Sequence, residues 1–507
     1  MFGRNIKTAA ASVLCIAALT SCEKFLTEYP TESVTSLTAI SSPSDVKTAM
    51  NGVYNKMTSM YYYGRQFLFY ADYKGSDLTV FSLGRGDSDF FAFQHEENNN
   101  AHETFWRYIY NDILQVCNVI ERSAELKDLS ASDQTSLDNY VGQAYALRAM
   151  FHFDLVRLYG YPYMKDNGAS LGVPIITTVL SADAQPQRAT VAEVYAQCIK
   201  DLETALPLLS KSKTNGNLNY YGAVAELARI YLYKGDYANA LKYSKEIIDS
   251  KVYTLYEPSQ WVASWKSQYG TESIFELYVS AEDGTDQAKS SPRWYTLAKG
   301  QGEGASGCWL ASEPFMDRLG EDETDVRWGV MQPDECALCG LGGVNVAPYY
   351  IPGRRGSIMK YDGDGKTPAT ATNIKVMRLS EIYLIAAEAA LGTGDKSAAA
   401  TYLNSIRCRA PKLAAATSST VSVDMILSER SKELVLEGHR YFDQLRLGRT
   451  ITYDDTTLGT KAGLMDFVLT PPDSRSTTVD WNYYRCVLPI SLDERNANPA
   501  IEQNPEY

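Results

Sequence analysis

Two stretches of the chain decide its fold, AVAELARIYLYKGDYANA at residues 223–240 and IYLIAAEAALGTGDKSAA at residues 382–399. Each stretch places small and apolar residues at helical spacing, breaks at Gly-Asp, and then resumes with alanines. Small residues allow two helices to approach closely, and Gly-Asp suits the turn between them. Each stretch therefore predicts a helical hairpin.

The spacing within both stretches is that of a tetratricopeptide repeat, a pair of helices that buries its core by stacking on neighbouring pairs. Two clear copies are too few for a continuous core, because about three repeats are needed. We expect the helical patterns at Arg148–Tyr159 and Val191–Leu209 to supply degenerate partners. The sequence therefore predicts a mainly α fold built on tetratricopeptide-like hairpins.

The rest of the chain alternates between helical and irregular segments. The irregular segments are rich in Gly, Trp, Tyr and Asp and lack a helical period. Long segments of this kind in a compact protein usually carry function. We expect one domain over residues 44–507, in which the hairpins support a loop-rich, irregular ligand-binding half. The helical scaffold is expected mainly at residues 44–60, 102–256 and 374–447, and the binding region mainly at 61–100, 257–373 and 450–485.

Composition excludes several classes of protein. The 507 residues are 45% hydrophobic and 21% charged, which is too polar for a multi-span membrane protein. The net charge is −13 and no block of five basic residues occurs, so nucleic-acid binding is not expected. The four histidines offer no i, i+4 pair for a metal. The excess of 36 Tyr over 15 Phe suits a contact-making exterior, because tyrosine has an apolar face and a polar tip. Many of these tyrosines, such as Tyr159 and Tyr383, fall in helical patterns and are expected to pack, so the excess does not identify a ligand site.

The N-terminus has the features of an export signal. Arg4 and Lys7 precede an apolar run over residues 8–20, which is shorter than the roughly 20 residues that span a bilayer. The run ends in Leu-Thr-Ser-Cys22, which resembles the bacterial lipobox, where cleavage before the cysteine is coupled to its lipidation. We expect a signal peptide at 1–21, a lipidated Cys22 and a polar tether over 22–43. The alternative is a plain secretory signal with a chance cysteine.

Cys336 and Cys339 form the one close pair of cysteines, within a Gly-rich stretch. A redox role would need a strand-to-helix turn, and a zinc site would need two further ligands nearby. The sequence indicates neither feature. We expect the two cysteines to belong to a loop without redox or metal chemistry. A local disulfide that involves Cys308 is one alternative for this loop.

An ordered set of short motifs runs through the mature chain. The first half contains Cys22-Glu-Lys-Phe-Leu26, Trp106 with Tyr110, Ile113 and Asn118, Arg148-Ala149 with Phe151–Tyr159, Gly160 and Pro162, Thr190 with Glu193 and Tyr195, and Asp201 with Ala205. The second half contains Arg378 with Glu381 and Tyr383, Asn404 with Arg407 and Arg409, Glu429-Arg430, Glu437-Gly-His-Arg440, Phe442-Asp443, Leu488-Pro-Ile490 and Gln503-Asn-Pro505 with Tyr507. The set resembles the SusD/RagB family, the surface glycan-binding lipoproteins of the starch-utilisation-system type. Gln143 and Glu506 depart from the usual pattern.

The resemblance implies a SusD-like fold and binding without catalysis. The resemblance implies a lipid anchor in the cell outer membrane. It also implies that loops outside the repeats form the ligand-binding surface, while the helical face packs on a partner. The expected ligand is an oligo- or polysaccharide, and the expected partner is a SusC-like TonB-dependent transporter for which the protein acts as the lid. Related lids serve peptide import, so peptide uptake is an alternative. A surface glycosidase is a third class.

Two groups of charged residues invite other readings. Carboxylates and arginines alternate from Glu429 to Arg446, and paired carboxylates are what glycoside hydrolysis uses. Their three- and four-residue spacing favours structural ion pairs that lock a helix against the hairpins. Asp362-Gly-Asp364 resembles the start of a calcium loop, but Asn373 stands where an EF-hand has its last glutamate. We expect a turn and no cofactor, with an isolated structural calcium as the alternative.

Sugar recognition needs flat aromatic faces flanked by polar groups that bind hydroxyls. Trp294 and Trp309 lie in irregular segments and are the leading candidates, and the alternative for each is burial in the core. Trp106 and Trp328 are set aside because they lie within family motifs. The predicted ligand-binding residues are Trp294, Trp309, Phe90, Phe91, Asp87, Tyr62 and Tyr349.

Overall fold

Helices make up most of the part of the chain that the structure describes. This computed structural model describes residues 40–80, 88–91, 93–98, 100–282, 291–296, 309–333, 355–366, 369–453 and 478–507. Within these ranges the strands form only two-stranded antiparallel sheets. The predicted mainly α fold is confirmed.

The longer helices belong to the scaffold. They are α2 (Pro43–Met57), α3 (Gln66–Lys74), α5 (Asn100–Ser123), α6 (Ala131–Tyr159), α8 (Val191–Ala205), α9 (Tyr220–Lys234), α10 (Tyr237–Ser250), α16 (Leu379–Gly392), α17 (Lys396–Arg407) and α18 (Val423–Leu434). The shorter helices are α4 (Ser88–Phe91), α7 (Tyr163–Asp166), α11 (Pro258–Ser264), α13 (Pro292–Thr296), α14 (Glu313–Gly320), α19 (Arg440–Arg446) and α22 (Leu492–Ala497). Single 3-10 turns are η1 (Leu206–Leu208), η2 (Val326–Val330), η3 (Ala369–Ala371) and η4 (Tyr484–Cys486).

The strands connect segments that are far apart in the sequence. The pairs are β1 (Leu78–Val80) with β3 (Trp309–Ala311), β2 (Ser273–Leu277) with β6 (Ile374–Arg378), β4 (Met331–Gln332) with β5 (Ser357–Ile358), and β7 (Ile451–Thr452) with β8 (Thr478–Val479). Leu78 lies opposite Ala311, and Ser273 lies opposite Arg378. These sheets tie the irregular half to the beginning and the end of the chain.

The Gly-Asp pairs make the two hairpin turns that the sequence predicts. Gly235 ends α9 with φ at +76°, and Asp236 caps α10 by accepting the backbone N–H of Asn239 at 3.1 Å. Gly394 has φ at +87°, and Asp395 caps α17 through the N–H of Ala398 at 2.9 Å. Glycine reaches this left-handed region at little cost, and aspartate satisfies an unpaired N–H at a helix start.

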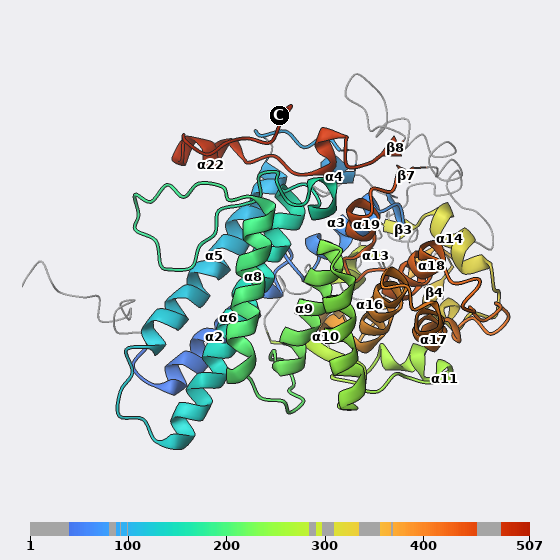
Figure 1. Ribbon diagram of the computed structural model, residues 1–507, viewed down its shortest axis with the longest axis horizontal. Helices are drawn as coiled ribbons and strands as arrows, with labels where there is room; N and C mark the ends of the chain where they lie inside the picture. Colours follow the sequence, from blue (N-terminus) through green and yellow to red (C-terminus); the bar gives the residue numbers. More distant parts are fainter. Residues whose placement is uncertain are drawn as a thin grey trace, which may run out of the picture.

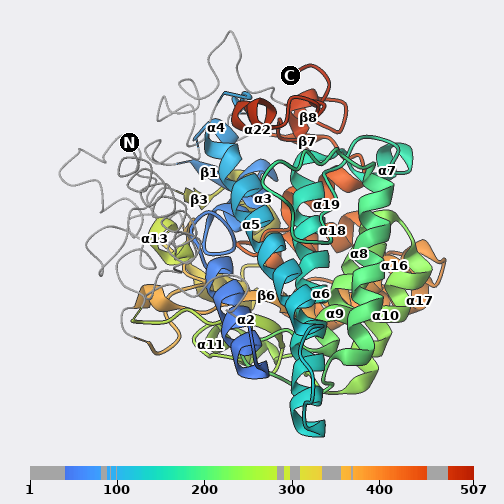
Figure 2. The same ribbon diagram turned by 90° about the vertical axis from the view of Figure 1, so that its left-hand side faces the viewer.

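The hairpins stack side by side into a curved helical array (Figures 1 and 2). Helix α6 packs on α5 and α8, α10 packs on α9 and α16, and α16 packs on α17. The predicted degenerate hairpin is confirmed, because the Arg148–Tyr159 segment lies in α6 and packs on α8. Arg148 joins these two helices through two hydrogen bonds to Asp201, each 2.8 Å long.

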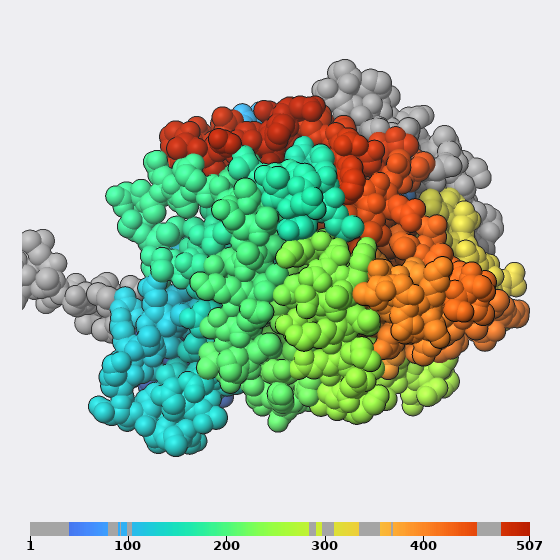
Figure 3. All heavy atoms as spheres, viewed as in Figure 1, coloured from blue at the N-terminus to red at the C-terminus, as the bar shows by residue number. Residues whose placement is uncertain are grey.

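The helical array presents one continuous face. Figure 3 shows this face running from α8, α9 and α10 in green to α16 and α17 in orange, with the red C-terminal segment along the top. The C-terminal segment is tied down where Asn504 donates to the carbonyls of Tyr159 and Leu488 at 2.9 and 2.8 Å. Among the described residues, none of the helices combines the length and apolarity required to cross a membrane.

Candidate functional site

Trp294 is partly exposed on the short helix α13, within the irregular half of the molecule. Its neighbours hold the helix in place, because Arg293 Nε donates to Asp362 Oδ1 at 2.8 Å and the guanidinium of Arg65 lies 4.4 Å from the ring centre of Tyr295. The indole ring of Trp294 itself packs at the edge of the core. This half-buried ring is the one predicted aromatic candidate that remains partly exposed in the described part of the chain.

Four other predicted residues lie inside an aromatic core. Tyr62, Phe90, Phe91 and Trp309 are each at most 2% exposed. The Trp309 ring stacks on Tyr73 at 4.7 Å and 17°, and the hydroxyl of Tyr62 donates to Asp154 at 2.5 Å. A sugar cannot stack on a ring face that protein atoms already cover, so in this structure these four side chains act in packing.

Asp87 and Tyr349 lie outside the described residues, and so do Cys22, Cys308, Cys336 and Cys339. Their predicted roles in ligand binding, lipidation and a disulfide stay predictions.

The aspartates of the possible calcium loop face protein cations and donors. Asp364 pairs with Lys366 Nζ at 3.0 Å and accepts the backbone N–H of Asn373 at 2.8 Å. Asp362 is engaged by Arg293. Within the described ranges, no three His, Cys, Asp or Glu side chains come together in a way that could hold a metal ion.

The charged residues between Glu429 and Arg446 form a buried ion cluster. The segment is not one helix but two, α18 and α19, with a break at which Gly438 takes φ of +83°. Glu433 meets Arg409 at 2.5 Å and Arg378 at 3.1 Å. Further pairs are Arg327–Glu429, Arg430–Asp443, Arg446–Glu388 and Lys360–Glu437.

The ion cluster is a structural element rather than a hydrolytic pair. Burial alone would raise the pKa of the Glu433 carboxyl, but Arg409 and Arg378 hold it below its usual range. Glycoside hydrolysis instead needs two carboxyl groups that face each other across a cleft, one of them with a raised pKa. The predicted locking of this segment against the hairpins is seen in the Arg446–Glu388 pair, which joins α19 to α16.

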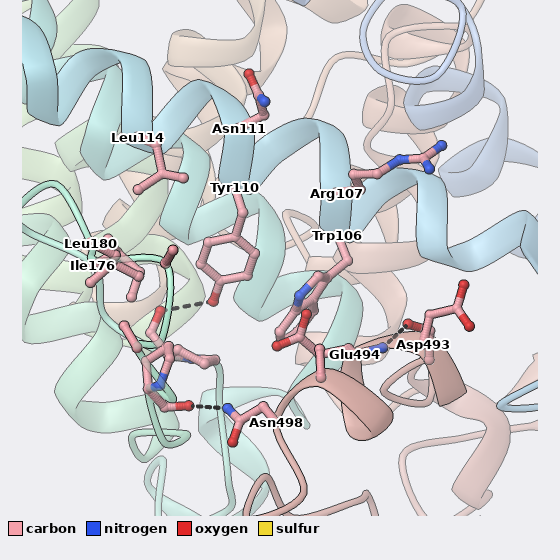
Figure 4. A pocket seen from close by; sticks show the side chains of 16 residues that line it. Trp106, Arg107, Tyr110, Asn111, Leu114, Ile176, Leu180, Asp493, Glu494 and Asn498 are labelled. Carbon is pink, nitrogen blue, oxygen red and sulfur yellow. Dashed lines mark hydrogen bonds between the residues drawn. The ribbon is translucent and has the colours of Figure 1, made fainter. Parts of the chain in front are cut away.

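A cavity of about 480 Å³ opens between α5, the loop at residues 174–186 and α22, and we call it the α5–α22 pocket. Figure 4 shows the rings of Trp106 and Tyr110 pointing from α5 toward the loop and α22. The walls include Trp106, Arg107, Tyr110 and Leu114 from α5, Ile176, Leu180 and Ala184 from the loop, and Asp493, Glu494 and Asn498 from the C-terminal segment. The pocket therefore combines an aromatic wall with carboxylate and amide groups.

Hydrogen bonds fix the loop that covers the pocket. Tyr110 donates its hydroxyl to the carbonyl of Pro174 at 2.8 Å, and Asn498 donates its amide to the carbonyl of Pro186 at 2.8 Å. Between these ends, Nε2 of the buried His152 accepts the backbone N–H of Ile176 at 3.0 Å. The loop is therefore tied to α5, α6 and the C-terminal segment.

The electrostatics of the pocket depend on its acidic side. Burial raises the pKa of the Glu494 carboxyl, and a hydrogen bond from Trp106 opposes that shift. The Trp106 and Tyr110 rings lie 4.8 Å apart at an angle of 56°. Such a lining can bind a small polar molecule that has apolar faces.

Sequence reasoning missed this pocket. Trp106, Tyr110 and Leu114 fall at four-residue intervals, a spacing that also describes a core-facing helix stripe. The polar wall comes from α22, which lies almost at the other end of the chain. The four-residue spacing of Trp106 and Tyr110 was the only sign of this pocket wall in the sequence. Nothing in the sequence indicated that α22 would lie opposite these two rings.

Two family models match the chain. The model described as "SusD family" matches residues 343–507, and the model described as "Starch-binding associating with outer membrane" matches residues 24–232. A curated relative, SusD-like protein P38 of Formosa agariphila, is 22% identical, and the match covers 99% of each chain.

Solved structures match over almost the whole chain. A SusD superfamily protein of Bacteroides thetaiotaomicron is 30% identical with a TM-score of 0.81, and the match covers 92% of this chain and 100% of that one. A SusD superfamily protein of Bacteroides vulgatus is 32% identical with a TM-score of 0.77, again over 92% and 100% of the two chains.

Proposed function

The chain belongs to the SusD/RagB family, and from this premise we propose that it is a glycan-binding lipoprotein that captures nutrient at the cell surface. The observation that carries the proposal is the likeness to SusD superfamily structures along nearly the whole chain, at 30% identity or more. The description of the matched N-terminal family model, starch-binding associating with the outer membrane, supports both a carbohydrate ligand and a membrane location.

Capture rests on side chains of the irregular half. Partly exposed aromatic rings such as Trp294 stack on the C–H faces of sugar rings, and neighbouring polar groups bind the hydroxyls. The protein binds without catalysis, and the inward-facing ion cluster around Glu433 supports this view because its carboxylates are already paired with arginines. The ligand class is therefore an oligo- or polysaccharide that leaves the protein unchanged.

The remaining parts of the proposal concern location and partner. A lipid on Cys22 anchors the protein to the outer membrane, and the protein acts as the lid of a SusC-like TonB-dependent transporter. The continuous helical face of α8–α10, α16 and α17 supports a role in packing on such a partner (Figure 3).

Metabolic labelling with a clickable fatty acid tests the anchor, since Cys22→Ser should abolish labelling and a labelled variant would refute the assignment. Co-purification with the transporter from outer membranes tests the partner.

Isothermal titration against a panel of polysaccharides and their oligosaccharides tests the ligand class. Binding of at least one glycan is expected, and Trp294→Ala should weaken that binding by about ten-fold if one stacking contact is lost. Trp328→Ala is the matched control, because Trp328 is a half-buried tryptophan whose indole donates to the carbonyl of Asp322 at 3.1 Å, outside the predicted binding set.

Two outcomes would contradict this picture. Binding of peptides with no binding of any glycan would favour peptide uptake, and release of shortened products from a polysaccharide would favour a surface glycosidase. Equal affinities of the Trp294→Ala and Trp328→Ala variants would remove Trp294 from the site while leaving glycan capture in place.

A further inference from the structure

The geometry points to the α5–α22 pocket as a saccharide subsite that takes one or two neutral sugar rings. This inference rests on the proposed function, because it names where and how part of a glycan is held. The pocket lies beside α22, whereas Trp294 lies on α13, and Figures 1 and 2 show these two elements in different parts of the molecule. The subsite is thus separate from Trp294.

The apolar side of the pocket suits the C–H faces of a sugar. Trp106 and Tyr110 come from successive turns of α5 and line the same side of the pocket, where Tyr110 is partly exposed and Trp106 keeps 6% of its surface exposed. Ile176 and Leu180 of the covering loop add apolar surface to the same cavity. A pyranose ring offers apolar C–H patches on its faces and hydroxyls around its edge, so it can use an aromatic wall and a polar rim at the same time.

The polar side of the pocket carries two carboxylates, on Asp493 and Glu494, and one guanidinium, on Arg107. Asp493 and Glu494 lie next to each other on α22, and Asn498 follows one turn later. Carboxylates accept hydrogen bonds from sugar hydroxyls, and such charge-assisted bonds are stronger than neutral ones. The same two carboxylates repel an acidic sugar, because like charges in a partly buried site are unfavourable. Two carboxylates against the one guanidinium of Arg107 leave the lining with a net negative charge, so the pocket favours neutral sugars over uronic acids.

The size and rigidity of the pocket fit a small ligand. Its volume of about 480 Å³ lies inside the range of about 300–1,000 Å³ that is typical of small-molecule sites. The hydrogen bonds that Tyr110 and Asn498 donate to the covering loop, and the one that His152 accepts from it, hold the loop in place before any ligand arrives. A preformed site orders few groups on binding, which favours affinity for a short saccharide.

A pocket-filling substitution tests the assignment. Ala184 is an exposed residue of the loop that lines the cavity, so Ala184→Trp should fill the cavity without disturbing the core. Ala131→Trp is the matched control, because Ala131 is also exposed and lies at the start of α6, away from the pocket. Glu494→Gln provides an independent variant that keeps the shape of the side chain and removes its charge. Circular dichroism and thermal melting check the fold of each variant.

The probes are neutral di- to tetrasaccharides of glucose, galactose, mannose and xylose, with galacturonate oligosaccharides of the same lengths, titrated calorimetrically. We expect a neutral probe to bind, Ala184→Trp and Glu494→Gln each to weaken it by at least about ten-fold, and Ala131→Trp to stay within about two-fold of the unmodified protein.

Each contrary outcome has a distinct meaning. Unchanged affinity in both pocket variants would overturn the subsite and leave glycan capture by other residues intact. If galacturonate probes bind more tightly than neutral probes, and if Ala184→Trp abolishes that binding, the pocket is a saccharide site but its preference for neutral sugars is refuted. Absence of binding by any probe or parent polysaccharide would overturn the subsite together with the proposed function.

Discussion

Replacing Asp112 by Asn is expected to stabilise the protein at neutral and alkaline pH. Asp112 lies in α5 with a side chain that is 1% exposed, and it forms an ion pair with Lys56, whose Nζ is 3.6 Å from Oδ1. Burial raises the pKa of this carboxyl from 3.8 to about 7, although Lys56 opposes the shift. The folded protein therefore holds a charged Asp112 at alkaline pH at a cost in free energy.

The sign and size of the effect follow from the two pKa values. Between pH 3.8 and about 7 the folded protein keeps a proton on Asp112 that the unfolded chain has released, so the free energy of unfolding falls as the pH rises. A shift of about three units corresponds to about 4 kcal/mol, and the loss is complete above about pH 7. Asparagine carries no charge, so it removes this penalty, and the lost attraction to Lys56 is already included in the net shift.

Guanidinium denaturation at about pH 5 and about pH 8 measures the effect. At each pH, the difference in the free energy of unfolding between Asp112→Asn and the unmodified protein is determined. This difference should be about 3 kcal/mol larger at about pH 8 than at about pH 5. Asp249→Asn is the control, because Asp249 is exposed on α10 and its replacement should change stability little at either pH. The reasoning is refuted if the Asp112→Asn difference is the same at both pH values, or if this variant is the less stable protein at about pH 8.

Three further predictions concern acid, packing and the ion cluster. Burial lowers the pKa of His152 from 6.5 to about 4, so stability present above pH 6.5 should be lost as the pH falls through this range, by about 3 kcal/mol, and the protection factor of the Ile176 amide against hydrogen exchange should fall with it. Gly392→Ala should destabilise by about 1–3 kcal/mol in thermal melts, because an added Cβ would lie 2.3 Å from the Tyr237 ring. Glu433→Gln should cost about 3–5 kcal/mol in chemical denaturation, because it leaves buried arginines without their partner.

Each of these three predictions has its own control. A protection factor at Ile176 that stays unchanged down to about pH 4 would contradict the role of His152 as an acceptor. Gly320 in α14 has open space around it, so Gly320→Ala should be harmless, and equal stability of the two glycine variants would contradict the packing argument. Glu323 is exposed, and a Glu433→Gln variant as stable as Glu323→Gln would show that the cluster contributes little.

The helical hairpins could be predicted from the sequence because their determinants are local. Gly235 with Asp236 and Gly394 with Asp395 each combine a left-handed turn and a helix cap within two residues. The break between α18 and α19 was missed because the charge spacing continues through it. The ion-pair partners of that segment lie on distant elements, such as Arg327 in η2. The spacing of charges along one helix does not reveal such partners.

The binding residues were harder to predict because burial depends on distant partners. Trp309 lies in a segment without helical period, which suggested an open loop, yet it pairs with β1 and stacks on Tyr73 of α3. Trp106 shows the opposite case, since its helical pattern suggested packing alone while the structure places it in a pocket wall. Aromatic residues serve both purposes, and composition alone does not separate them.

The ion cluster around Glu433 has a consequence for how the protein responds to salt. Exposed ion pairs weaken as ionic strength rises, since charges are screened beyond a Debye length of about 8 Å in physiological salt. Glu429, Arg430, Glu433, Asp443 and Arg446 of α18 and α19 are buried, so mobile ions screen them far less. The scaffold should therefore keep its shape over a wide range of salt concentrations, while contacts between exposed charges weaken as the salt concentration rises.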